Sequence, residues 1–253
     1  MVTVIGSHLT RKNNMVTLIN RIDSKHINKI ENEILHISQF KSPTNKLHGF
    51  QAIGTNTTTN SFCIKMNDSS KKVTVNKNNL EDNPNLANYV LICKANSWTT
   101  FSLWTKRKDI IERFFSKHPK PKNLILIYSN PVINKPITKT FGYFDKIFNN
   151  VSEDKYINKQ NCTGQQCITC KRCYKHSKKD TSNIIYEKVK GSKELINICK
   201  ACYSHKAINF RKHTMVAPLQ RNSNLLQTKL KPIQIPKIMD RYFRFNHHGE
   251  LIS

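Results

Sequence analysis

Apolar positions recur along the chain with two different periods, and these periods predict where helices and strands lie. Residues 24–40 place isoleucines at steps of three and four, which predicts one amphipathic helix: Ile27, Ile30, Ile34 and Ile37. Residues 47–66 are rich in threonine and alternate in polarity, which predicts an extended strand that ends beside Cys63. Residues 67–83 are polar and charged, which is typical of a linker or loop.

Residues 84–151 have the clearest rhythm, because helical and extended patterns follow one another there. The pattern predicts, in order, a helix over Asn85–Asn96, a strand over Thr99–Trp104, a helix over Arg107–His118, a buried strand over Asn123–Ser129 and a further strand over Phe141–Val151. A helix–strand–helix–strand series is typical of parallel βα units. We therefore expect an α/β fold in which the strands of residues 99–104 and 123–129 are parallel neighbours joined by the helix between them.

The blocks predict one principal domain with an extension. Residues 1–46 are expected to form an N-terminal helical extension, and residues 47–253 a single α/β domain. Within that domain, residues 152–190 are cysteine-rich, and residues 191–253 contain a CxxCY block and a final strand over Tyr242–Asn246. A chain of 253 residues can bury such a core without disulfides.

The charge of the chain adds a candidate partner. Lys and Arg total 42 against 16 Asp and Glu, which gives a formal net charge of +26 and a pI near 9.9. Nucleic acid is the obvious polyanion, although abundant Lys, Asn and Ile are also what an AT-rich genome encodes. The candidate phosphate contacts are Lys106, Arg107, Lys171, Arg172, Arg211 and Lys212, and the candidate stacking rings are Trp104, Tyr203, Phe210 and Tyr242.

No apolar stretch approaches the ~18 residues of a membrane span, and no signal peptide stands at the start. We therefore expect a cytoplasmic protein without a membrane partner, in the host cytoplasm if a phage encodes it. Thiols stay reduced in that compartment. The eight cysteines are then better explained as metal ligands than as a disulfide framework.

Four cysteines form the most specific motif of the chain. Cys162, Cys167, Cys170 and Cys173 follow the spacing C-x4-C-x2-C-x2-C, so four soft ligands stand within twelve residues. We expect them to bind a metal, with Lys171 and Arg172 lowering the pKa values of the thiols. Both zinc and an iron–sulfur cluster suit the spacing.

A second group is less complete. Cys199 and Cys202 form a CxxC pair, and Cys63 is the candidate third ligand, with a fourth position open or taken by a substrate or cofactor. Cys93 shares a predicted helix face with apolar residues and is expected in the core. His247 and His248 are candidate ligands or phosphate contacts.

Several segments resemble those of the phage "gene product 88" family: NKLHGFQAIGTNTTTNSFC, ICKACYS, YFRFNHHGELIS, NSWTTFSLWTKR, NLILIYSNPVIN, FDKIFNNV and NCTGQQCITCKRCYK. That family in turn resembles radical S-adenosylmethionine proteins. The resemblance implies a complete or partial (β/α) barrel-like parallel sheet with cysteine-rich metal loops. It implies a [4Fe–4S] cluster on Cys63, Cys199 and Cys202, and an additional metal site on the four cysteines from Cys162 to Cys173.

The order of the blocks departs from the family. There the CxxCY block follows FCIKM within a few residues, whereas here residues 199–253 come last. If the family architecture survives, Cys63 should lie near Cys199 and Cys202, and the strand Tyr242–Asn246 should lie between the strand near Cys63 and Thr99–Trp104. Otherwise the chain is an inactive rearranged copy.

Two functions from different classes follow. The first is an iron–sulfur enzyme of the radical S-adenosylmethionine type that acts on a nucleic-acid-related substrate, with the cofactor supplying the chemistry. The second is a non-enzymatic, metal-stabilised nucleic-acid-binding protein.

Overall fold

The described part of the chain forms one seven-stranded sheet, whose longer strands are rich in β-branched and aromatic residues. The computed structural model describes residues 33–70, 83–176, 180–189 and 196–252. The strands are β1 (Ser38–Gln39), β2 (Gln51–Ile53), β3 (Thr100–Thr105), β4 (Leu124–Ser129), β5 (Lys146–Val151), β6 (Ile184–Lys188) and β7 (Tyr242–Phe245). Their order in the sheet is β1-β2-β7-β3-β4-β5-β6, and every neighbouring pair is parallel except β1 and β2.

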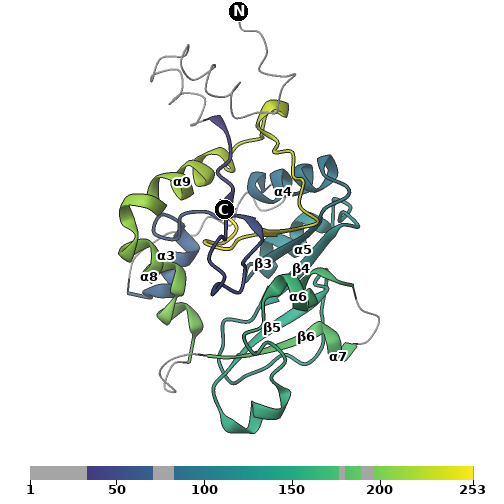
Figure 1. Ribbon diagram of the computed structural model, residues 1–253, viewed down its shortest axis with the longest axis vertical. Helices are drawn as coiled ribbons and strands as arrows, with labels where there is room; N and C mark the ends of the chain where they lie inside the picture. Colours follow the sequence, from purple (N-terminus) through teal and green to yellow (C-terminus); the bar gives the residue numbers. More distant parts are fainter. Residues whose placement is uncertain (1–32, 71–82, 177–179, 190–195, 253) are drawn as a thin grey trace, which may run out of the picture.

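Helices separate the strands along the chain. The α-helices are α3 (Ser61–Asn67), α4 (Pro84–Ala95), α5 (Lys108–Phe115), α6 (Cys167–Cys170), α7 (Asp180–Asn183), α8 (Tyr203–Phe210) and α9 (Lys212–Leu225). The 3-10 turns are η1 (Asp154–Lys159), η2 (Arg172–Tyr174), η3 (Ile198–Ala201) and η4 (Pro232–Gln234). Figure 1 shows α3, α8 and α9 as one group at the left, apart from α4 and α5.

The two faces of the sheet bury different side chains, because successive residues of a strand point to opposite faces. Leu124 and Leu126 join a large core with α4 and α5, whereas Ile125 and Ile127 join a smaller cluster with Phe148 and Ile185. Cys162, Cys173 and Trp104 pack at the margin of that smaller cluster. The cysteine-rich segment therefore covers the face opposite α4 and α5.

The central part of the prediction is confirmed. β3 and β4 are parallel neighbours, with Phe101 opposite Leu124, and α5 connects them. α4 follows the predicted helix of residues 85–96, and Cys93 is fully buried in the core. β7 lies between β2 and β3, as the expected family architecture requires.

The fold is α/β with a mostly parallel sheet, and that sheet is open. β1 and β6 stand at opposite ends of the strand order, so the described strands do not close into a complete barrel. The antiparallel β1 is the second departure from the expected barrel. It extends the sheet beyond β2 and brings the described end of the N-terminal block, residues 33–46, onto the principal domain.

Three element predictions were wrong in part. The helix over 24–40 does not extend through its described end, because residues 38 and 39 pair with β2 as a strand; residues 24–32 lie outside the described ranges. The strand over 47–66 is confined to β2, and Cys63 lies in helix α3. The strand over 141–151 begins only at Lys146, because the preceding residues turn, with the amide of Phe144 donating to the carbonyl of Phe141. Of the expected linker, residues 71–82 lie outside the described part of the chain.

Candidate functional site

A cavity of about 170 Å³ opens at the carboxyl ends of the parallel strands. We call it the strand-end cavity. Its wall is built from residues at or after the ends of β3, β4 and β7 together with α3, η3 and the start of α8: Thr57, Phe62, Cys63, Met66, Trp104, Lys106, Ser129, Cys199, Cys202, Ser204, Arg244, Asn246, His247, Gly249 and Glu250. Ligands of open parallel sheets bind at this edge.

Three cysteines from distant segments of the chain meet in this wall. Cys63 comes from α3, Cys199 from η3, and Cys202 from the residue that follows η3. The structure thus brings together the three residues that the resemblance indicated, although more than 130 positions separate the first from the other two. Their role as ligands stays a prediction.

Asparagines hold the cysteine-bearing segments in place. The Asn60 side chain accepts from the Cys63 amide at 3.1 Å and donates to the Glu250 carbonyl at 3.1 Å. Asn67, at the end of α3, donates to the Cys199 carbonyl at 2.9 Å, and the Asn197 side chain accepts from the Cys199 amide at 2.8 Å. Cys63 and Cys199 therefore lie on backbone held by side-chain hydrogen bonds, and the Cys202 amide donates to the Cys199 carbonyl at 3.2 Å.

The charges of the cavity are concentrated on Lys106 and Glu250. The Glu250 carboxylate is buried, and it accepts from the Lys106 amide at 2.8 Å, from the Leu251 amide at 3.0 Å and from the Thr105 hydroxyl. The Lys106 ammonium donates to Ser129 Oγ at 3.3 Å. Burial disfavours the charged form of Lys106, but electrostatic interactions with Cys199 and Glu250 outweigh burial and raise the pKa of Lys106, so this ammonium stays protonated.

The thiols of Cys63 and Cys199 are held neutral when no metal ion is bound. Burial raises the pKa of Cys199 to about 11 and the pKa of Cys63 well above its ordinary value. The charge of Glu250 adds to both shifts, and Lys106 opposes them. A bound metal cation would offset the free-energy cost of ionising these buried thiols, because it stabilises thiolates directly.

Arg244 lies between the two cysteine groups. It lines the strand-end cavity, its guanidinium carbon lies 4.2 Å from the centre of the Trp104 ring, and its charge lowers the pKa values of Cys167 and Cys173 against the larger effect of their burial. Its Nε is buried and has no hydrogen-bond partner among the described residues. One face of Trp104 is thus already covered, which contradicts its expected role as an open stacking ring.

Gly249 forms the tightest backbone contact of the cavity, and we expect Gly249→Ala to destabilise the protein. The residue has φ +78°, and an added Cβ would stand 2.7 Å from the Thr55 carbonyl oxygen. Overpacking and strain together should lower the free energy of unfolding by about 3 kcal/mol. Gly49 has the same φ but nothing within 4 Å, so Gly49→Ala should cost only about 1 kcal/mol. Urea unfolding of both variants measures the difference, and equal losses would contradict the contact.

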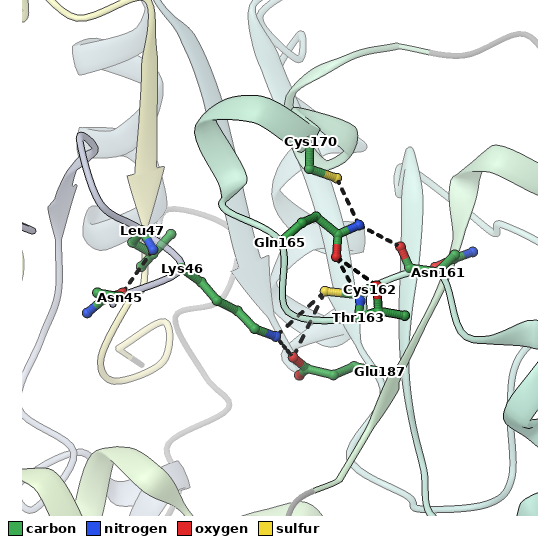
Figure 2. A network of polar contacts seen from close by, with 9 residues as sticks. All are labelled: Asn45, Lys46, Leu47, Asn161, Cys162, Thr163, Gln165, Cys170 and Glu187. Carbon is green, nitrogen blue, oxygen red and sulfur yellow. Dashed lines mark hydrogen bonds and ion pairs between the residues drawn. The ribbon is translucent and has the colours of Figure 1, made fainter. Parts of the chain in front are cut away.

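Cys162, Cys167, Cys170 and Cys173 form a second group, which we call the cysteine loop. Figure 2 shows Cys162 directed toward Lys46 and Glu187, which form an ion pair. Its sulfur lies 4.0 Å from Lys46 Nζ and 3.9 Å from Glu187 Oε1. Cys170 instead faces Gln165, whose Nε2 lies 3.8 Å from the sulfur. The Cys167 amide donates to the Lys46 carbonyl at 2.8 Å, which ties the loop to the residues before β2.

Burial dominates the acidity of this loop and corrects the expected role of its neighbours. It raises the pKa of Cys162 to about 11 and that of Cys173 to about 12. The cations that oppose these shifts are Lys46 at Cys162 and Arg244 at Cys173, rather than Lys171 and Arg172. Side chains adjacent in sequence point elsewhere: the Lys171 ammonium lies 5.7 Å from the centre of the Tyr242 ring.

Within the described ranges, no group of three or more His, Cys, Asp or Glu side chains is arranged closely enough to hold a metal ion. Both cysteine groups nevertheless have the donor chemistry of a metal site: each gathers reduced thiols, which are all free, in a partly enclosed wall. Holding a metal requires the side chains to turn toward a common centre.

Two of the expected phosphate contacts do not lie on the open surface. The Arg107 side chain is only 1% exposed and binds Asp109 with two nitrogens, and Lys106 faces the strand-end cavity. Lys171 and Arg172 are half-buried on the cysteine loop, whereas Arg211 and Lys212 are exposed between α8 and α9. His247 and His248 are both largely buried, and burial lowers the pKa of His248 to about 4, so it is neutral at pH 7.

Compared with models of known protein families, with curated proteins and with solved structures, the chain matches none of them. No helix in the described part of the chain combines the length and apolarity needed to cross a membrane.

Sequence reasoning missed Glu250, Arg244 and the asparagine caps. Glu250 belongs to the run HHGE, which directly follows the strand predicted over Tyr242–Asn246. A glutamate at this position could have been recognised in the sequence as a candidate site residue. Arg244 lies within a strand, and only the pairing of β7 with β3 shows that it faces Trp104.

Proposed function

We propose that the protein is an iron–sulfur enzyme of the radical S-adenosylmethionine type, with a [4Fe–4S] cluster held by Cys63, Cys199 and Cys202. The observation that carries the proposal is the meeting of these three thiols in one cavity at the carboxyl edge of a parallel sheet. Three thiolates leave one iron of such a cluster without a protein ligand. When bound, the cluster would supply an electron to S-adenosylmethionine and so start radical chemistry on a substrate.

The surrounding residues suit that task. Glu250 is a buried acceptor whose carboxylate is held by two backbone amides, so its position is fixed before any ligand arrives. Lys106 supplies a positive charge beside the thiols and favours their ionised form. Phe62 and Met66 contribute apolar surface that limits the access of water.

A finer description of the fold is part of the same proposal. The strands β2, β7, β3, β4, β5 and β6 are all parallel in this order, which supports a partial barrel whose strand β1 is an addition. In that architecture the cysteine loop is a second metal site on the inner face. Zinc and iron–sulfur chemistry both suit its four thiols.

Anaerobic purification and reconstitution with iron and sulfide test the proposal. We expect a brown protein whose absorbance bleaches on reduction, and which then cleaves S-adenosylmethionine to methionine and a deoxyadenosyl product. A colourless protein that carries only zinc would contradict the cluster. Iron without cleavage would contradict the enzyme and leave a metal-stabilised binding protein.

A further inference from the structure

A second, larger hollow of about 870 Å³ lies beside the strand-end cavity, between α8 and the segment that contains β1. We call it the α8 cleft. His247 lines both hollows, so they adjoin each other just after the end of β7. A ligand bound in the α8 cleft would therefore lie next to the strand-end cavity.

The face of α8 that lines this cleft exposes two large aromatic side chains to solvent. Tyr203, Lys206, Ala207 and Phe210 stand at steps of three and four residues, so they share one helix face, and all four line the cleft. Tyr203 is 75% exposed and Phe210 is 89% exposed. Aromatic rings left in water in this way mark an interaction surface.

The charge of the cleft points to the class of ligand. Lys41, Lys206 and Arg211 line it, and no Asp or Glu is among its described lining residues. His248 also lines the cleft; it is neutral at pH 7, and the centre of its ring lies 6.1 Å from that of Tyr203. Cations beside open aromatic rings suit a strand of phosphates and bases.

We propose that the α8 cleft binds single-stranded nucleic acid, with bases stacked on Tyr203 and Phe210 and phosphates bound by Lys41, Lys206 and Arg211. The two rings are seven residues apart on α8, which corresponds to about 10 Å along a helix and to the length of about three stacked nucleotides. A single strand fits better than a duplex, because the rings can stack only on bases whose faces are open. The assignment of single-stranded nucleic acid as the substrate of the enzyme rests on the proposed function. The binding of nucleic acid in the α8 cleft does not depend on that function.

Fluorescence anisotropy with a labelled single-stranded DNA of about 12 thymidines tests this binding on the full chain. Tyr203→Ala/Phe210→Ala should weaken binding at least about 25-fold, since each stacked ring contributes about fivefold or more. The matched control is Trp98→Ala, an exposed ring 57% accessible that lies outside the cleft and also has an arginine above it. The Trp98→Ala variant should bind the labelled DNA as tightly as the unmodified protein does.

A second pair of variants tests the phosphate contacts. Lys206→Gln/Arg211→Gln should reduce the steepness of the decline of log affinity with log salt by about 1.4, because a single strand contributes about 0.7 for each phosphate contact, whereas the exposed pair Lys94→Gln/Lys188→Gln should leave it nearly unchanged. Tighter binding of the matching duplex, or equal weakening by Trp98→Ala, would overturn the proposal.

Iron content, measured on each variant, separates the two proposals. Variants that keep their iron but bind no less tightly would refute the α8 cleft as the binding site. A chain without iron whose binding still depends on Tyr203 and Phe210 would refute the cluster and leave the cleft intact.

Discussion

Replacement of Cys63 by serine should abolish the cleavage of S-adenosylmethionine and lower the affinity of the strand-end cavity for iron by more than about a hundredfold. Loss of an outer-shell partner alone costs metal sites about ten- to a hundredfold, and loss of a ligand costs more. Cys199→Ser and Cys202→Ser should have the same effect, because the three thiols line one wall. Iron analysis and product chromatography after anaerobic reconstitution measure both quantities.

Cys93→Ala is the matched control for these variants. Cys93 is also a free and buried cysteine, but it packs in the apolar core beneath the sheet. Its variant should keep full iron content and cleavage, with only a modest loss of stability from the small cavity left behind. Iron content unchanged in Cys63→Ser would exclude this residue as a ligand.

The double variant Cys162→Ser/Cys173→Ser should release the metal of the cysteine loop and lower the melting temperature by about 10 °C. The binding free energy of a structural metal is on the order of 10 kcal/mol, and a loss of only ~3 to 4 kcal/mol produces this shift in a chain of this size. The loop covers Ile125 and Ile127, so loosening it exposes part of the smaller apolar cluster. Differential scanning calorimetry with and without a chelator measures the effect.

The chelator itself supplies the control. Applied to aerobically purified protein that carries no cluster in the strand-end cavity, it should lower the melting temperature of the unmodified protein to that of the double variant and leave the double variant unchanged, because both then lack the same metal. A double variant as stable as the unmodified protein, with no metal in either, would show that the cysteine loop is held by its hydrogen bonds and apolar contacts alone.

Local patterns predicted the elements that are buried on both sides or packed along one face. The strand LILIYS and the helix with Ile110, Ile111, Phe114 and Phe115 were correctly located, because burial selects apolar residues at the period of each element. The segments at the margin of the sheet were less predictable. Residues 38–39 continue a helical pattern in sequence, yet pairing with β2 makes them a strand.

The candidate ligands were likewise visible in the sequence, since cysteine spacing identifies a metal-binding group without any knowledge of the fold. The residues that surround these cysteines could not be identified from the sequence. The buried Glu250 beside Lys106 and Arg244 over Trp104 join residues that are distant along the chain. The Asn60 cap is local, but it places Cys63 in a helix where the residue pattern predicted a strand.

The sequence by itself determined the α/β class, the parallel pair β3 and β4, the core position of Cys93 and the two groups of cysteines. Only the tertiary structure decided that β7 enters between β2 and β3, that the sheet stays open, and that three thiols share a cavity with Lys106 and Glu250. The physical reason is that periodicity and spacing record local backbone geometry. Strand order and the charges around a buried group depend on contacts between segments more than a hundred residues apart.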